Sequence, residues 1–151
     1  MSYWLLKTEP STFGLEHLEK MPKRITPWDG VRNFQARNFI RDMRKGDLAF
    51  FYHSSCKVPG IVAIVEVVKN PYPDDTAFDP KSPYYDEKST LENPRWYRVD
   101  VQLVSKFKDI ISLTSLRNEK SLRDMLLLKP GSRLSVTPVT SVQWHTICDM
   151  G

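Results

Sequence analysis

The chain has 151 residues, of which 40% are hydrophobic, 26% charged and 11% aromatic, and this composition excludes a chain that is disordered as a whole. The length provides a hydrophobic core for one domain, expected to span 1–151, and is too short for two. The net charge is +4, and the longest apolar run, 61–65, is too short to cross a membrane, so we expect a soluble protein with no membrane partner.

Five segments carry the pattern of β-strands. The clearest is 96–104, where Val99 and Val101 fall on one face and Arg98 and Asp100 on the other, as in a half-buried antiparallel strand. β-branched and aromatic residues mark others. The predicted strands are 3–7, 48–53, 60–68, 96–104 and 133–139.

Helical patterns lie between these strands. The longest is 31–45, which Gly46 ends. Its apolar stripe consists of Ala36, Phe39, Ile40 and Met43, and a neighbouring row consists of Arg37, Arg41 and Arg44. Shorter helices are predicted at 12–19, 122–127 and 141–148, the last capped by Thr140 or Ser141. Strands and short helices without a regular βαβ rhythm predict an α+β fold with a mostly antiparallel, barrel-like sheet.

The segment 70–95 is predicted to be a loop. It contains five prolines, and proline lacks the backbone N–H that regular pairing needs. Loops of this length are either functional or disordered. Aromatic residues among the prolines favour an ordered loop that packs over a site.

Positive charge is concentrated in one part of the chain. Between Arg24 and Lys45 there are six basic residues and two acidic ones, so this segment alone has a net charge of +4. Such a concentration attracts polyanions. A solvated helix face without a partner is the alternative interpretation.

Motifs for catalysis or metal binding are mostly absent. The six glycines show neither the Walker nor the Rossmann spacing of phosphate-binding loops. No pair of His or Cys residues has the spacing of a zinc site. We therefore expect no metal and no cofactor. Only His53 and Cys56 resemble a nucleophilic pair, and no third group orients them. With no secretory features in the chain, Cys56 and Cys148 indicate a reduced, intracellular protein.

Polar residues alternate with aromatic ones at 7–10, 28–38 and 50–55. A nucleobase needs a flat apolar surface for its face and a few donors and acceptors for its edge, and stacking on an aromatic ring contributes about 1–3 kcal/mol per base. Trp28 is the candidate surface, although a core position is the alternative. The candidate edge-reading residues are Thr8, Glu9, Asn33, His53 and Ser54.

The same segments resemble the EVE-domain family. The matching stretches are 3–10 (YWLLKTEP), 28–38 (WDGVRNFQARN), 45–54 (KGDLAFFYHS), 59–62 (PGIV), 78–86 (FDPKSPYYD), 94–96 (PRW) and 131–136 (GSRLSV). They extend over nearly the whole chain. One departure is Ser55-Cys56, where the family pattern has Asn-Cys.

The resemblance implies a PUA-like fold, a small mixed or antiparallel β-barrel flanked by short helices, related to the YTH domains that hold methylated adenine in RNA. It implies a non-enzymatic protein whose partner is DNA carrying a modified base, methylated or oxidised cytosine among them, turned out of the stack into a pocket. The pocket residues it implies are Lys7, Thr8, Glu9, Trp28, Asp29, Asn33, Tyr52, His53 and Ser54, with Tyr84, Tyr85 and Trp96 from the long loop. Phosphate binding is expected from Arg32, Arg37, Arg41 and Arg44.

Three other functions are left open at this point. The ligand can instead be RNA, since nothing in the sequence indicates a contact to the 2′-hydroxyl. Cys56 and His53 can form a small thiol-dependent enzyme, and the basic helix can bind an acidic protein. A base reader is expected in the cytoplasm, associated with the nucleoid of a bacterium or inside the nucleus of a eukaryote.

Overall fold

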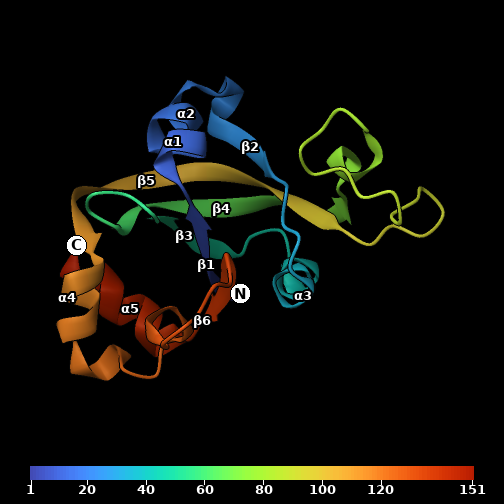
Figure 1. Ribbon diagram of the computed structural model, residues 1–151. Helices are drawn as coiled ribbons and strands as arrows, with labels where there is room; N and C mark the ends of the chain where they lie inside the picture. The colour runs from blue at the N-terminus through green and yellow to red at the C-terminus, as the bar shows by residue number, and fades with distance from the viewer.

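The protein is built around one six-stranded sheet in the order β2-β5-β4-β3-β1-β6, and the computed structural model describes residues 1–151 (Figure 1). The strands are β1 (Tyr3–Thr8), β2 (Ile25–Trp28), β3 (Leu48–His53), β4 (Gly60–Pro73), β5 (Tyr97–Ser112) and β6 (Val136–Val139). All neighbours are antiparallel except β1 and β3, which run parallel. The predicted α+β fold with a mixed sheet is confirmed.

The predicted barrel is not closed. Strands β2 and β6 are the two edges of the sheet and do not pair with each other. Each is four residues long and contains a proline, Pro27 in β2 and Pro138 in β6. Proline lacks the N–H group for a second ladder and is therefore typical of edge strands.

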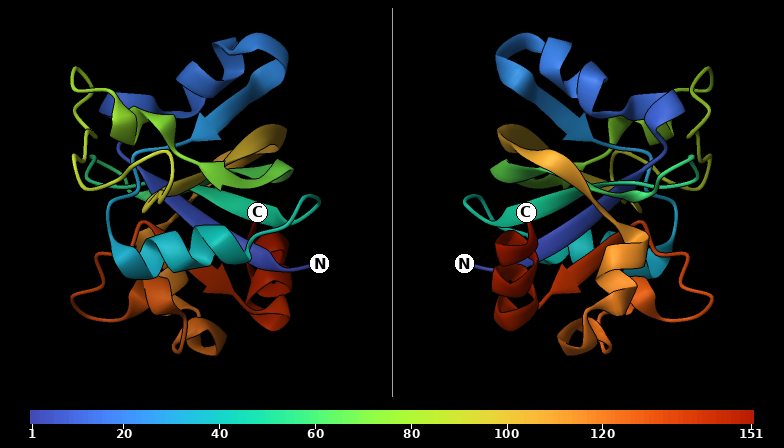
Figure 2. Two further views of the ribbon diagram at one scale, coloured as in Figure 1. Left: turned by 90° about the vertical axis from the view of Figure 1, so that its right-hand side faces the viewer. Right: turned by 90° about the vertical axis from the view of Figure 1, so that its left-hand side faces the viewer.

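Short helices pack on both faces of the sheet (Figures 1 and 2). The α-helices are α1 (Pro10–Phe13), α2 (Leu15–Lys20), α3 (Phe34–Asp42), α4 (Leu113–Asn118) and α5 (Ser141–Met150), and the 3₁₀ turns are η1 (Pro22–Arg24), η2 (Asp75–Phe78), η3 (Lys120–Leu122) and η4 (Leu126–Leu128). None of the helices is long and apolar enough to cross a membrane.

Capping residues determine where the two longer helices begin. The side chain of Asn33 accepts a hydrogen bond from the N–H of Ala36 at 3.0 Å, so α3 begins three residues later than predicted. It also ends earlier, because Met43 already has an extended backbone. At α5 the cap is Thr140, whose side chain accepts from the N–H of Gln143 at 3.1 Å.

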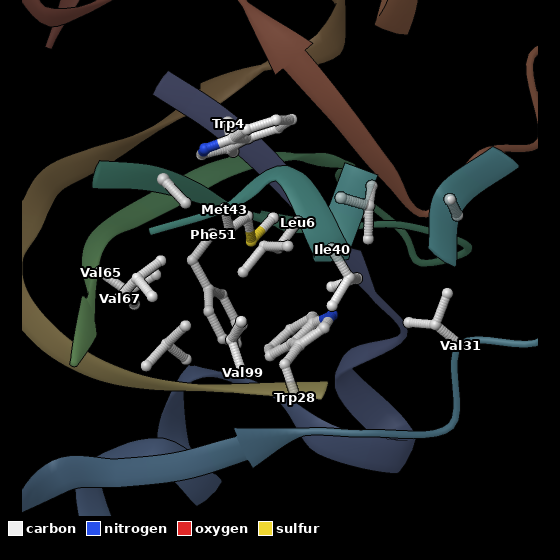
Figure 3. Close-up of a cluster of buried hydrophobic side chains, with 14 of the residues drawn as sticks. Trp4, Leu6, Trp28, Val31, Ile40, Met43, Phe51, Val65, Val67 and Val99 are labelled. Carbon is white, nitrogen blue, oxygen red and sulfur yellow. The ribbon is translucent and has the colours of Figure 1, made fainter. Parts of the chain in front are cut away.

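Two hydrophobic cores lie on opposite faces of the sheet. Adjacent strand residues point to opposite faces, so Leu6 and Phe51 belong to the first core, and Leu5 and Phe50 to the second. The first core, shown in Figure 3, also includes Trp28 and the buried side of α3. The second is covered by residues of α4, α5 and the 3₁₀ turns between α4 and β6. Apolar residues on both faces explain why the central strands show little alternation.

Several elements differ from the prediction. Strand β2 and helix α4 were not predicted, β5 extends to Ser112, β6 begins only at Val136, and η3 and η4 replace the helix at 122–127. The predicted loop begins later than expected, because 70–73 continue β4. Proline is tolerated in this part of β4 because β3 pairs only with 60–66, so 70–73 have β5 as their one partner strand.

Candidate functional site

A cleft of about 610 Å³ opens beside the first core. It lies where β1 ends in α1 and where β2 ends in the turn that leads to α3. A cleft of this volume is within the range of small-molecule sites, roughly 300–1,000 Å³. Its lining consists of Lys7, Thr8, Glu9, Thr12, Phe13, Met21, Thr26, Pro27, Trp28, Asp29, Gly30, Val31, Arg32, Asn33, Tyr84 and Ser135.

Trp28 belongs to both the core and the cleft. Its side chain is 7% exposed and meets the ring of Phe51 edge-on, with centroids 5.6 Å apart. Figure 3 shows the indole among the apolar side chains of the first core. Trp28 is also one of the residues that line the cleft. Trp28 is thus a core residue that also borders the cleft.

The strand end of β1 brings a cation into the cleft. Lys7 is half-buried, forms none of the ion pairs in the protein, and burial lowers the pKa of its ammonium group. Thr8, beside it, donates its hydroxyl hydrogen to the carbonyl of Phe13 at 2.8 Å and so holds α1 against β1. Glu9 is exposed at the cleft rim. Among these three cleft-lining residues, Lys7 is the one whose side chain is half-buried and forms no ion pair.

Asp29 brings an acid into the same cleft. Burial raises the pKa of its carboxyl, as does the neighbouring carboxylate of Asp74, while Arg98 and Arg32 act in the opposite direction. The nearest cation is the guanidinium of Arg98, whose Nη1 lies 3.8 Å from Asp29 Oδ2. Arg98 is closer to Asp75, at 3.0 Å. The carboxyl of Asp29 is thus only loosely paired within the protein.

Asp74 fixes the turn that forms one wall of the cleft. It is fully buried, and its Oδ2 accepts hydrogen bonds from the N–H of Gly30 and from Arg32 Nη1, both at 2.9 Å. Its Oδ1 accepts from the N–H and the hydroxyl of Thr76. Burial raises the pKa of Asp74, but these hydrogen bonds and the charge of Arg32 outweigh burial and leave the pKa below its ordinary value. This carboxylate therefore stays ionised and rigidly held.

Arg32 attaches the long loop to the cleft. Its Nε and Nη2 donate to the carbonyl of Tyr84 at 3.0 and 2.8 Å, and its guanidinium lies over the rings of Tyr84 and Trp96. The ring of Tyr84 rests on Gly30, where a Cβ atom would lie 2.6 Å from it, and the φ of +76° at Gly30 also favours glycine. The donors of Arg32, expected to bind phosphate, are engaged within the protein.

The structure brings seven of the twelve predicted pocket residues to the cleft: Lys7, Thr8, Glu9, Trp28, Asp29, Asn33 and Tyr84. It does not bring Tyr52, which points to the second core and is 3% exposed. Strand alternation explains this position, because Phe51 beside it occupies the first face. Tyr85 is exposed outside the cleft.

Three further residues lie behind the cleft. His53 accepts a hydrogen bond through Nε2 from the N–H of Leu15 at 3.1 Å, and burial lowers its pKa. The backbone N–H of Ser54 donates to the carbonyl of Thr8 at 2.9 Å. Trp96 donates from Nε1 to Asp86 at 2.7 Å. These three residues do not line the cleft themselves. Their hydrogen bonds connect segments that do.

The other predicted phosphate-binding arginines lie along α3 and just beyond it. Arg37 donates to the carbonyl of Arg95 at 2.8 Å, and Arg41 is exposed and lies over the ring of Tyr97. Arg44 follows the end of the helix and donates to the carbonyls of Arg41 and Met43. The predicted helical row therefore applies to Arg37 and Arg41 alone.

Sequence reasoning missed Thr26 and Pro27 because it missed β2, a strand of four residues that includes a proline. It also missed Asp74, whose partner Gly30 is 44 residues away. No local pattern marks either. Both cysteines are free, and no group of three or more His, Cys, Asp or Glu side chains is placed to hold a metal ion.

The comparison with protein families decides where this chain belongs. A model described as "EVE domain" matches residues 2–150. The chain belongs to the EVE-domain family. Thymocyte nuclear protein 1 of Gallus gallus is 43% identical over 165 residues, covering 98% of this EVE protein and 68% of the relative. The resemblance inferred from the sequence is confirmed.

Solved structures agree with this EVE fold. A protein from Pseudomonas putida superimposes with a TM-score of 0.94 at 46% identity, covering 99% of both chains. Human THYN1 in complex with 5-methylcytosine-containing DNA has a TM-score of 0.94 at 40% identity, covering 99% of this chain and 97% of that one. The YTH domain of Zygosaccharomyces rouxii MRB1 has a TM-score of 0.52 at 14% identity, covering 99% of this chain and 85% of that one, which shows a related fold.

Proposed function

We propose that this EVE protein binds DNA and holds one modified base, of the methylated or oxidised cytosine class, in the cleft beside Trp28. The base is turned out of the stack, and the protein catalyses no reaction on it. The observation that carries this proposal is the cleft itself, whose lining includes Trp28, Lys7 and Asp29. The solved complex of human THYN1 with 5-methylcytosine DNA supports it, because the two folds are so similar.

The free energies are consistent with such a site. Extruding a base costs a few kcal/mol, and less when the strand is already single. Stacking on an aromatic surface offsets about 1–3 kcal/mol of this cost. Trp28 provides the floor, and Tyr84 provides a wall that Arg32 and Gly30 hold in place.

Lys7 and Asp29 are the proposed edge-reading pair. Cytosine presents a carbonyl acceptor and an exocyclic amine donor, and carboxylates accept hydrogen bonds from that amine. The ammonium of Lys7 is a donor, and the carboxylate of Asp29 is an acceptor. Neither is committed to a close partner in the protein. A methyl group on the base adds about 1–3 kcal/mol in a shaped apolar pocket, so discrimination from cytosine is moderate.

The other predicted site residues do not read the base edge in this proposal. Thr8, Glu9 and Asn33 form the rim, while Tyr52, His53, Ser54, Tyr85 and Trp96 do not contact the base. Phosphates are bound by Arg37, Arg41 and Arg44, whereas Arg32 anchors the loop. His53 already accepts a backbone N–H, which supports a non-enzymatic protein over a thiol enzyme with Cys56.

Isothermal titration calorimetry with a single-stranded oligonucleotide that carries one 5-methylcytosine tests the proposal. Asp29→Asn replaces a charged acceptor by a neutral one, and Lys7→Met removes a charged donor. Each is expected to weaken binding roughly tenfold, since a hydrogen bond that involves a charged group contributes about 1.5–3 kcal/mol. Unchanged affinity in both variants, with unchanged thermal unfolding, would contradict the proposal. Lys108→Met, a substitution of an exposed lysine on β5, is the matched control.

The same assay decides between DNA and RNA when matched strands compete. We propose DNA, and preferential binding of the RNA strand would overturn this part. A DNA reader works where DNA is, so we propose the nucleoid or the nucleus as its location. We also propose that 1–151 form one domain, which the family match over 2–150 supports.

A further inference from the structure

Phe34 is an exposed aromatic residue with an ordered ring. It is the first residue of α3, and 48% of its surface is exposed. Its ring stacks on the indole of Trp96, with centroids 4.8 Å apart and planes at 23°. Phe34 and Trp96 thus form a stacked aromatic pair in which Phe34 is the solvent-exposed member.

Two guanidinium groups lie over the same ring. The Cζ of Arg37 is 5.0 Å from the centroid of Phe34, and the Cζ of Arg95 is 5.2 Å from it. Hydrogen bonds hold both cations in place: Arg37 donates to the carbonyl of Arg95, and Arg95 pairs with Asp86 at 3.4 Å. A guanidinium has five N–H donors, so each arginine keeps donors for a further partner.

This group of side chains adjoins the cleft. Asn33 lines the cleft, and Phe34 is the next residue, with Cα atoms about 3.8 Å apart. On the other side Arg32 lies over both Trp96 and Tyr84, and the ring of Tyr84 is a wall of the cleft. Helix α3 and the loop after η2 also lie on the same side of the molecule (Figures 1 and 2).

We propose that Phe34, with Trp96 stacked on its ring and the guanidinium groups of Arg37 and Arg95 within about 5 Å of its centroid, binds a second nucleotide: the DNA neighbour of the one whose base enters the cleft. The neighbouring base stacks on Phe34, and the two arginines contact its phosphate. This inference rests on the proposed function. A nucleotide matches the site because it combines a π-face with a negative charge, the two properties that an aromatic ring and guanidinium groups recognise together.

The position of the site gives it a physical role. When a base leaves the stack, its neighbour loses a stacking partner, and proteins that distort DNA often insert an apolar side chain at such a step. Phe34 replaces the lost partner and so lowers the cost of extrusion. Because every base has a π-face, the site accepts any neighbouring base.

The test compares a short ligand with a longer one. The short ligand is 5-methyl-2′-deoxycytidine 5′-monophosphate, and the longer one is a single-stranded trinucleotide with 5-methylcytosine at its centre. Amide chemical-shift titration measures both affinities. Phe34→Ala is expected to weaken trinucleotide binding about tenfold and to leave mononucleotide binding within a factor of two. Phe34→Tyr keeps the π-face and is expected to behave like the wild type.

Trinucleotides with one abasic flank identify the contact. When the base that stacks on Phe34 is missing, Phe34→Ala is expected to have no further effect, whereas an abasic site on the other flank leaves the tenfold loss unchanged. Substituting Arg37 by alanine is expected to lower the slope of log affinity against log salt concentration by about 0.7 for a single strand. Val104→Ala, which changes a 53% exposed residue on β5, is the control.

The outcomes separate the two proposals. A wild-type protein that binds neither ligand contradicts the base cleft and, with it, the second site. A wild-type protein that binds both, with Phe34→Ala equal to the wild type on the trinucleotide, overturns the second site alone. Equal weakening of both ligands by Phe34→Ala also overturns it, because the residue then acts through the cleft.

Discussion

Two tryptophans on opposite faces of the sheet have nearly equal exposure and different surroundings. Trp144 is 5% exposed and lies against Phe50 and Tyr3, with ring centroids at 4.0 and 4.5 Å. Trp28 is 7% exposed, meets Phe51 edge-on and lines a cleft. Solvent exposure therefore does not separate a residue enclosed in a core from one that borders a cleft. The distinction depends on what occupies the space beside the ring.

The largest effect that tests this comparison is on stability. Trp144→Ala removes a stacked ring from the second core and is expected to lower the free energy of unfolding by about 3–5 kcal/mol, measured by urea denaturation. Its folded fraction should bind a 5-methylcytosine oligonucleotide with wild-type affinity. Trp28→Ala should lower both stability and affinity. Impaired binding in folded Trp144→Ala would show that the two faces are coupled.

A smaller effect on stability is expected from substitutions of two glycines, one at the cleft wall and one away from it. Gly30→Ala and Gly131→Ala both place a side chain at positive φ, +76° and +73°, and each is expected to destabilise by about 1–3 kcal/mol. Only at Gly30 does the new Cβ meet the ring of Tyr84, whereas nothing lies within 4 Å at Gly131. Calorimetry should therefore show weaker oligonucleotide binding in Gly30→Ala alone. Equal binding by both variants would mean that Tyr84 is no part of the site.

The smallest effect concerns two acids near the cleft. The pKa of Asp29 is raised in the folded state, so its contribution to stability is present at low pH and is lost as pH rises above 3.8 through the raised value. The pKa of Asp74 is lowered, so its contribution is present above 3.8 and is lost as pH falls through the lowered value. Urea unfolding of the wild type and of Asp29→Asn across pH should differ only above 3.8. A difference confined to lower pH would contradict this assignment.

The sequence predicted the fold where patterns were local. Strands β1 and β3 are dense in apolar residues, so the sequence indicated both strands. The family resemblance implied Tyr52 at the pocket, and the run 50–52, which is apolar on both faces of the sheet, shows no alternation that would have indicated its side. The contact between Asp74 and Gly30 joins residues 44 positions apart, and no spacing indicates it. The family resemblance supplied Tyr84 but could not show that Arg32 holds it.

The parallel pairing of β1 and β3 has a consequence for how this family can diversify. Parallel neighbours cannot be joined by a tight turn, so the chain must travel from the far end of β1 back to the start of β3, and this return path carries α1, β2 and the 29–33 turn. The return path thus supplies most of the lining of the cleft, and the end of β1, Tyr84 and Ser135 complete it. Insertions in the parts of the return path outside β2, namely 9–24 and 29–33, would reshape the cleft, while the strands of the sheet would keep their pairing.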